Sequence, residues 1–277
     1  MKIFKSFFLI INYKTVITSL ISLGAAYLCN VYEIKAEFPL YLISIAIVFP
    51  IVFSIDSAYK RREFALQQYA DLKAHALSYY FGVREWVQPY KPEIATEVKV
   101  EINALFENMS ANFLLEPEEA KKKEHEMYER FSNLSARVAD FKEYGSAGSE
   151  NSRLHQYVSK MIVSYGIMKN IFYYRTPITL RAYSKVFIYF FPILYGPFCA
   201  STFSDYSHGI GYVIAVLYSV ILVSLDNLQE HIENPFDQVG EDDIKFEVEE
   251  LNDAMIKWNN QLCKTHLKKC TTTKSQC

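Results

Sequence analysis

The stretch FPLYLISIAIVFPIVFSIDSAYKRR, residues 38–62, decides the fold of this chain. About eighteen uncharged residues run almost directly into Lys60, Arg61 and Arg62, which is the pattern of a membrane span that meets water. The stretch therefore predicts a helix that crosses a bilayer and ends in a cationic segment on one side of it.

An apolar stripe runs along this predicted helix. Ile45, Phe49 and Phe53 recur every four residues, so their side chains stack on one slowly drifting face of a helix. In a single-chain helical protein the stripe would pack against another helix, whereas around a symmetry axis it would form a stack of hydrophobic rings. Pro50 lies between the two phenylalanines and removes one backbone hydrogen bond.

The composition is uneven along the 277 residues. Residues 59–170 and 226–277 are rich in Glu, Lys, Gln and Arg, while residues 15–58 and 177–225 hold almost all the long apolar runs. This division predicts membrane parts and aqueous parts. The net charge of −2, without a basic stripe interleaved with aromatic residues, gives no indication of nucleic-acid binding.

Four apolar runs are near the ~20 residues that cross a ~30 Å hydrocarbon core. They cover residues 15–31, 38–57, 178–203 and 209–225. The two short loops between them carry one lysine, whereas the N-terminal lead-in and the middle block carry many cations. Since cytosolic loops attract Lys and Arg, both termini are predicted to be cytosolic.

The expected fold class is an all-α membrane protein with four transmembrane helices and a helical cytosolic region. In the middle block we expect helices over 62–81, 91–115 and 117–144, the first ended by Gly82 and Pro89. The domain boundaries follow from these patterns: 1–58 for the lead-in and first two spans, 59–176 for the cytosolic helical region, 177–225 for the last two spans, 226–262 for an acidic motif and helix, and 263–277 for a disordered tail.

Motifs for catalysis are missing from the sequence. No Gly-rich phosphate loop, HExxH or nucleophile elbow is present, and carboxylates among lysines at helical spacing are typical of a solvated face. We therefore predict that the protein is not an enzyme. Cys263, His266, Cys270 and Cys277 could share a helix face and hold a metal, but the short, lysine-rich terminal segment favours a disordered tail.

The segment HIENPFDQVGEDDIKFE, residues 231–247, carries three consecutive acids. Carboxylates and an amide close in sequence can bind Ca²⁺ through oxygen. The alternative is that Asp242 caps a helix running to about Leu262, with its acidic neighbours favoured by the helix dipole.

At two places the chain resembles the bestrophins. FSIDSAYKRRE, after an apolar helix, is similar to the segment in which a bestrophin pore helix ends in an Arg-bearing cytosolic extension. ENPF followed by GEDD and FE is similar to the acidic cluster after the family's last span. The order of spans and cytosolic block also agrees, over roughly residues 15–250.

The resemblance implies a homopentameric anion channel with one central pore in the lipid bilayer, conducting chloride or other small anions. Counted back from Arg61, the hydrophobic neck of the pore would fall on Ile45, Phe49 and Phe53. Five copies of each would form rings without fixed charge, which favour ions that lose water easily. Arg61 and Arg62 would raise the local anion concentration at the cytosolic mouth.

The resemblance also implies a calcium clasp, which here would use Asn234, Asp242 and Asp243. In this chain Asp237 to Val239 are inserted, and Ile244 and Lys245 replace the last two acids of the family pattern, and a lysine disfavours bound Ca²⁺. The alternative is that these residues only cap and brace the end of the fourth span. A second reading of the whole chain is a non-conducting membrane scaffold whose cytosolic helices bind a partner.

Overall fold

A computed structural model describes residues 11–37, 39–87, 91–174, 178–202, 209–238 and 243–257, and the described secondary structure is helical. The chain divides into two units. The first contains Met1–Glu63 and Tyr174–Pro235, and the second contains Phe64–Tyr173 and Phe236–Cys277. The expected tail at 263–277, with Cys263, His266, Cys270 and Cys277, lies outside the described residues.

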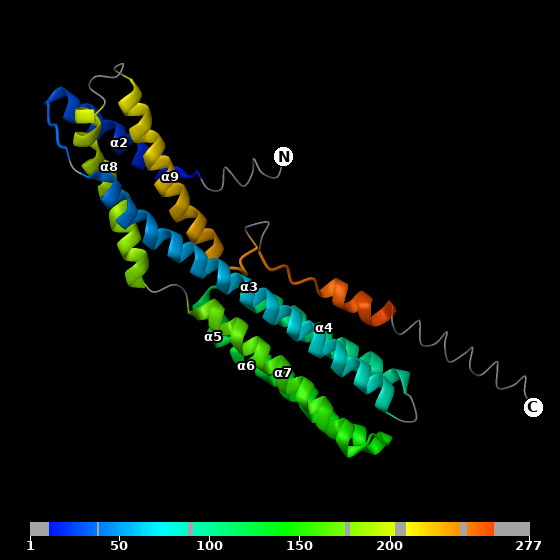
Figure 1. The fold of residues 1–277 in the computed structure, drawn as a ribbon. Helices are drawn as coiled ribbons and strands as arrows, with labels where there is room; N and C mark the ends of the chain where they lie inside the picture. Colours follow the sequence, from blue (N-terminus) through cyan, green and yellow to red (C-terminus); the bar gives the residue numbers. More distant parts are fainter. Residues whose placement is uncertain are drawn as a thin grey trace, which may run out of the picture. The chain divides into compact units, whose positions relative to one another are not determined.

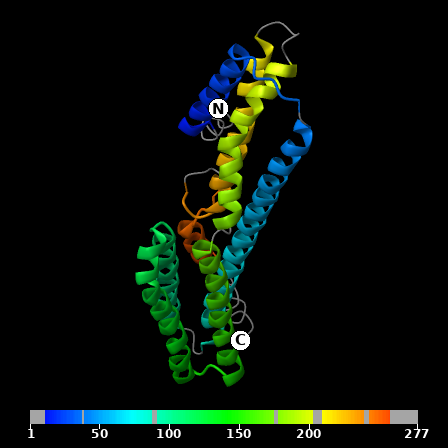
Figure 2. The same cartoon turned by 90° about the vertical axis from the view of Figure 1, so that its left-hand side faces the viewer.

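The first unit is a helical bundle. It contains α2 (Tyr13–Val31), α8 (Ile178–Thr202), α9 (Ile210–Glu233) and the N-terminal part of α3 (Leu40–Trp86). Helices α2, α8 and α9 lie side by side (Figures 1 and 2). Segments from both ends of the sequence therefore build one membrane unit.

Helix α2 has its polarity reversed relative to a helix of a water-soluble protein. Its buried residues are Thr15, Thr18, Ser22 and Ala26, while large apolar side chains such as Leu20 are exposed. Small residues allow close helix packing in lipid, where apolar side chains can face outward without cost. The burial pattern is that of a helix surrounded by hydrocarbon.

Among the described residues, three helices are long and apolar enough to cross a membrane: Tyr13–Val31, Ile43–Trp86 and Ile210–Glu233. The third expected span also forms a helix, α8, of 25 residues. Its sequence holds Arg181, Lys185 and two prolines. Of the four expected spans, three thus have the composition of a membrane helix by themselves.

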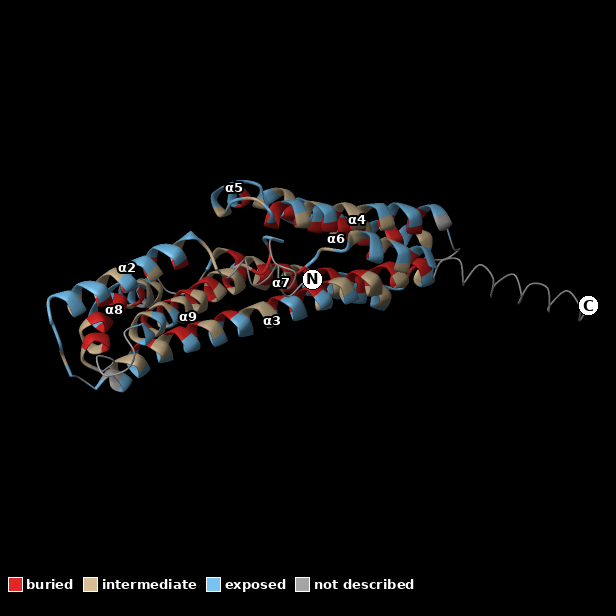
Figure 3. Ribbon diagram, turned by 90° about the horizontal axis from the view of Figure 1, so that it is seen from above, coloured by how far each residue is buried: buried red, intermediate tan, exposed pale blue. Residues whose placement is uncertain are grey.

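The second unit contains the rest of α3 together with α4 (Pro92–Phe113), α5 (Pro117–Lys122), α6 (Glu124–Asp140), the 3₁₀ helix η1 (Phe141–Tyr144) and α7 (Gly148–Tyr173). Residues 248–257 form a further helix. Buried and exposed residues alternate along α4 and α6 in Figure 3, as expected for amphipathic helices around an apolar core.

Two expectations about the second unit need correction. The predicted helix over 117–144 is divided into α5, α6 and η1, with Lys123 between the first two. Gly82 does not end its helix, because α3 continues to Trp86. A Cβ at Gly82 would lie 2.8 Å from Leu154 Cδ2, so the glycine admits a close approach of α7 to α3.

Candidate functional site on the second membrane helix

The predicted stripe lies on an exposed face of α3. Ile45, Phe49 and Phe53 are 48%, 54% and 62% exposed, and the ring centroids of the two phenylalanines are 5.9 Å apart. The three side chains therefore form one continuous apolar surface along the helix.

The opposite face of α3 is the one that packs inside the unit. Ile47 and Ile51 are 1% and 0% exposed and belong to an apolar cluster with Phe191 of α8 and Leu222 of α9. The stripe is thus not needed for packing within the described first unit. It is available to lipid, to a second copy of the chain or to a pore axis.

The two arginines predicted at the cytosolic mouth have different surroundings. Arg61 Nη2 donates a hydrogen bond to the carbonyl oxygen of Tyr174. Arg62 Nη1 lies 2.6 Å from Glu63 Oε1, so an adjacent carboxylate offsets its charge. Both arginines thus have a hydrogen-bonding partner in the first unit.

A group of ion pairs at one end of the first unit was missed by sequence reasoning. Glu230 of α9 accepts from Lys14 of α2 at 2.7 Å and from Lys185 of α8 at 2.8 Å, and Arg181 pairs with Glu233. Arg181 and Lys185 lie four residues apart, and Glu230 and Glu233 lie three apart. Each pair therefore shares one face of its helix, and this spacing was the available signal.

An asparagine connects the same end of α2 to α9. The Oδ1 of Asn12 caps α2 by accepting from the backbone N–H of Lys14 at 3.0 Å, while its Nδ2 donates to Asn227 Oδ1 at 3.0 Å. Capping satisfies a backbone N–H that has no partner inside the helix. The ion pairs and this tether together fix α2, α8 and α9 where the membrane unit ends.

The residues of the predicted calcium clasp are only partly described. Asn234 is the C-cap of α9, Asp243 is half-buried, and Asp242 lies outside the described residues. Within the described part of the chain, no group of three or more His, Cys, Asp or Glu side chains could hold a metal ion. The clasp stays a prediction.

The segment after α9 packs into the core of the second unit. Phe236 is fully buried and stacks on Phe113 with ring centroids 4.5 Å apart, and Phe246 stacks on the same ring at 5.6 Å. Ile244, which stands where the family pattern has an acid, is 2% exposed in this core. Its apolar side chain therefore has a packing role in place of an ionic one.

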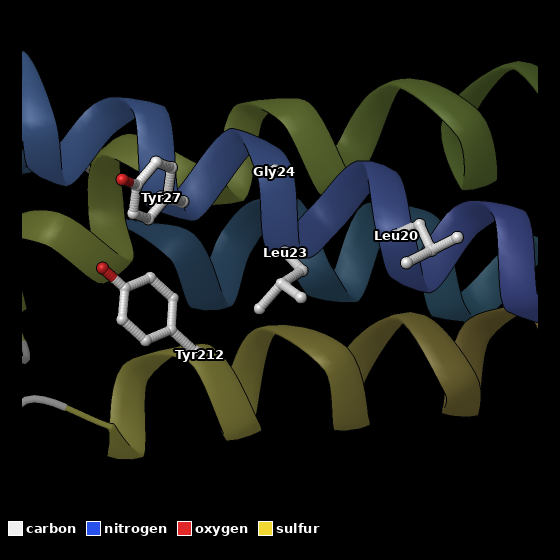
Figure 4. A pocket seen from close by; sticks show the side chains of 5 residues that line it. All are labelled: Leu20, Leu23, Gly24, Tyr27 and Tyr212. Carbon is white, nitrogen blue, oxygen red and sulfur yellow. The ribbon is translucent and has the colours of Figure 1, made fainter.

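An apolar recess of about 350 Å³ lies between α2 and α9. Leu20, Leu23, Gly24, Tyr27 and Tyr212 line it (Figure 4). Tyr212 Oη accepts a hydrogen bond from Asn30 Nδ2 at 2.9 Å. The described residues that line the recess are all uncharged.

Comparison with solved structures decides the fold. A bacterial bestrophin homologue from Klebsiella pneumoniae carrying an aspartate-to-alanine substitution matches with a TM-score of 0.74 and 15% sequence identity, over 88% of this chain and 97% of that one. This chain has a bestrophin-like fold. A tyrosine-to-alanine variant of the Klebsiella protein matches with a TM-score of 0.72 and 15% identity, over 88% of this chain and 95% of that one.

The bestrophin resemblance predicted from two short motifs is thus confirmed at the level of the fold. A crystal structure described as a membrane protein also matches, with a TM-score of 0.71 and 15% identity over 88% of this chain and 94% of that one. No protein-family model and no curated protein sequence matches the chain.

Proposed function

We propose that the protein is one subunit of a passive anion channel, in which four transmembrane helices with cytosolic termini assemble as a homopentamer. The observation that carries the proposal is the exposed apolar stripe on α3, opposite a fully packed face. The bestrophin-like fold supports the same assignment. Around a fivefold axis the stripe would form three stacked rings.

The chemistry of these rings suits weakly hydrated anions such as chloride. Ile45, Phe49 and Phe53 place no fixed charge in the neck, so an ion must lose part of its water to pass. The edges of phenylalanine rings carry partial positive charge and can face an anion. Arg61 and Arg62 lie less than two helical turns beyond Asp56 on the same helix. They would concentrate anions at the cytosolic mouth.

Ion currents test the proposal directly. The full chain, reconstituted in planar bilayers under a chloride gradient, is expected to conduct with a reversal potential close to that of chloride. Phe53→Ala is expected to raise the conductance severalfold, because a smaller side chain widens the neck and lowers the dehydration barrier. Val52→Ala is the matched control, since Val52 is also exposed on α3 but lies about 100° around the helix from Phe53.

The absence of anion current from the wild type, with none gained in Phe53→Ala, would sink the proposal. A monomer or dimer by native mass spectrometry together with silent bilayers would favour the non-conducting scaffold instead.

Calcium is not expected to control these currents. Ile244 and Lys245 stand where the family pattern has acids. The positive charge of Lys245 opposes binding of Ca²⁺. We therefore predict equal currents in micromolar Ca²⁺ and in excess chelator, measured on the same bilayer. A reversible loss of current in chelator would instead identify Asn234, Asp242 and Asp243 as a functional clasp.

A further inference from the structure

Two cysteines of the first unit lie at a close contact between α2 and α8. A Cβ added to Gly196 of α8 would lie 3.0 Å from the backbone of Ala25 and 3.2 Å from Cys29 Sγ, both in α2. Cys199 follows Gly196 by three residues on α8, and both thiols are free. The glycine therefore leaves the space in which the Cys29 side chain lies against α8.

Helices α2 and α8 run in the same direction. At their N-terminal ends, Lys14 and Lys185 both pair with Glu230, at 2.7 and 2.8 Å. At the other end of α8, Ser201 Oγ donates a hydrogen bond to the carbonyl oxygen of Ala36, shortly after the end of α2, at 3.2 Å. A step along one helix is thus matched by a step in the same direction along the other.

One helical turn beyond the contact of Ala25 with Gly196, each helix carries a cysteine. Residues three or four apart share a helix face, so Cys29 lies on the face of Ala25 and Cys199 on the face of Gly196. The two thiols are close enough to interact electrostatically. A disulfide joins Cα atoms about 4.4–6.8 Å apart, which requires helices in close contact, as α2 and α8 are here.

The two cysteines differ in exposure. Cys199 is 4% exposed, whereas Cys29 is half-buried. A buried cysteine by itself packs as a small apolar side chain. That role accounts for Cys199, but it does not account for a second, more accessible thiol on the facing side of the neighbouring helix.

We propose that Cys29 and Cys199 form a redox-controlled disulfide that joins α2 to α8, with a low-molecular-weight disulfide as the oxidant. The more accessible Cys29 attacks as a thiolate, forms a mixed disulfide and releases the first small thiol. Cys199 loses its proton, attacks the Cys29 sulfur and releases the second small thiol. Two electrons pass from the cysteines to the oxidant, and the two protons lost by the cysteines end on the two released thiols.

The position of the pair suits such a bond. Cys29 lies two residues before Val31, where α2 ends, at the end of the unit away from Lys14 and Glu230. In the proposed topology this end faces away from the cytosol, where disulfides persist. The compartment rests on the proposed topology, whereas formation of the bond in purified protein does not.

Oxidation of the purified full chain in detergent tests the pair. The background carries Cys263, Cys270 and Cys277 replaced by serine, and the probe is oxidised glutathione. The intact mass is expected to fall by that of two hydrogens and to return to its starting value in reductant. Digestion should release one peptide pair, joined through Cys29 and Cys199.

The matched control carries Cys29→Ser and Leu28→Cys in the same background. Leu28 is 53% exposed and lies about 100° around α2 from Cys29, so the new thiol is more accessible but lies on a different face. It is expected to gain glutathione and to form the intrachain disulfide at least about tenfold more slowly than the native pair.

The disulfide is also expected to stabilise the first unit, because a cross-link between distant residues constrains the unfolded chain. Thermal unfolding in detergent should show a midpoint about 5–10 °C higher for the oxidised background protein than for the reduced one. Cys199→Ser in the same background should show no change on oxidation, because it cannot form the bond.

Mixed disulfides without the intrachain bond would overturn this inference. Equally fast cross-linking in the Leu28→Cys control, or an unchanged midpoint on oxidation of the native pair, would overturn it as well. None of these measurements depends on ion conduction, so the cysteine pair and the channel can fail separately.

Discussion

Glycine controls how closely α8 approaches α2 in the membrane unit. A Cβ at Gly196 would lie 3.0 Å from the backbone carbonyl carbon and oxygen of Ala25 and 3.2 Å from Cys29 Sγ. A backbone cannot move aside as a flexible side chain can, so a side chain at this position would push the two helices apart by a few tenths of an ångström. In lipid, such close contact is a main source of helix association.

We predict that Gly196→Ala lowers the free energy of unfolding in detergent by about 1–3 kcal/mol, because the added methyl group separates α8 from α2. The control is Gly24→Ala, where a Cβ would meet nothing within 4 Å. That variant should be neutral or stabilising by up to about 1 kcal/mol, owing to the better helix propensity of alanine. Equal destabilisation by both variants would contradict the packing explanation.

At the scale of elements, α3 combines two environments in one helix of 47 residues. Its first part exposes Phe49 and Phe53, as a helix in lipid or around a hydrophobic pore can. Further along, buried Tyr79 donates a hydrogen bond to the Leu134 carbonyl oxygen at 2.8 Å, which is typical of a water-soluble core where polar atoms are paired. A single helix therefore belongs to both units.

The ends of α2, α8 and α9 are held together by Glu230. We predict that Glu230→Gln lowers the free energy of unfolding by about 2 kcal/mol, because two half-buried lysines lose their shared carboxylate. Asp56→Asn is the matched control. Asp56 pairs with Lys60 at 2.7 Å, but both side chains are exposed, and such pairs contribute less than about 1 kcal/mol. Chemical denaturation of the two variants in the same detergent measures the difference, and similar losses would contradict the inference.

At the scale of the whole molecule, the proposed topology sets which side of the membrane each region occupies. The middle block contains the sequons Asn108-Met109-Ser110 and Asn133-Leu134-Ser135, and the proposed topology places both in the cytosol. Expressed in a glycosylating host, the protein should therefore carry no glycan. An increase in mass that a glycosidase removes would place the middle block on the opposite side of the membrane and contradict the proposed topology.

Thiol labelling gives an independent measurement of the same topology. In a background with the native cysteines replaced by serine, Ser132→Cys should react with a membrane-impermeant reagent only from the cytosolic side. Lys35→Cys, in the exposed segment after α2, should react only from the opposite side. Reaction of both from one side would contradict the four-span arrangement.

The periodicity of the sequence determined the helices and their environments. Apolar runs of bilayer length predicted α2, α3, α8 and α9, and the helix expected from residue 117 does begin there, as α5. Two short motifs indicated the bestrophin-like fold. Helical periodicity and short motifs depend on the spacing of apolar and polar residues along the chain, so they can be recognised from consecutive residues.

Only the tertiary structure decided which residues meet across the chain. It showed that α2 buries its small polar face, that Gly82 lies at a close approach within a helix and that Ile244 packs in a core. It also brought Lys14 and Glu230 together, 216 residues apart. Contacts of this kind depend on how helices pack in three dimensions, and one sequence read along its length does not contain that information.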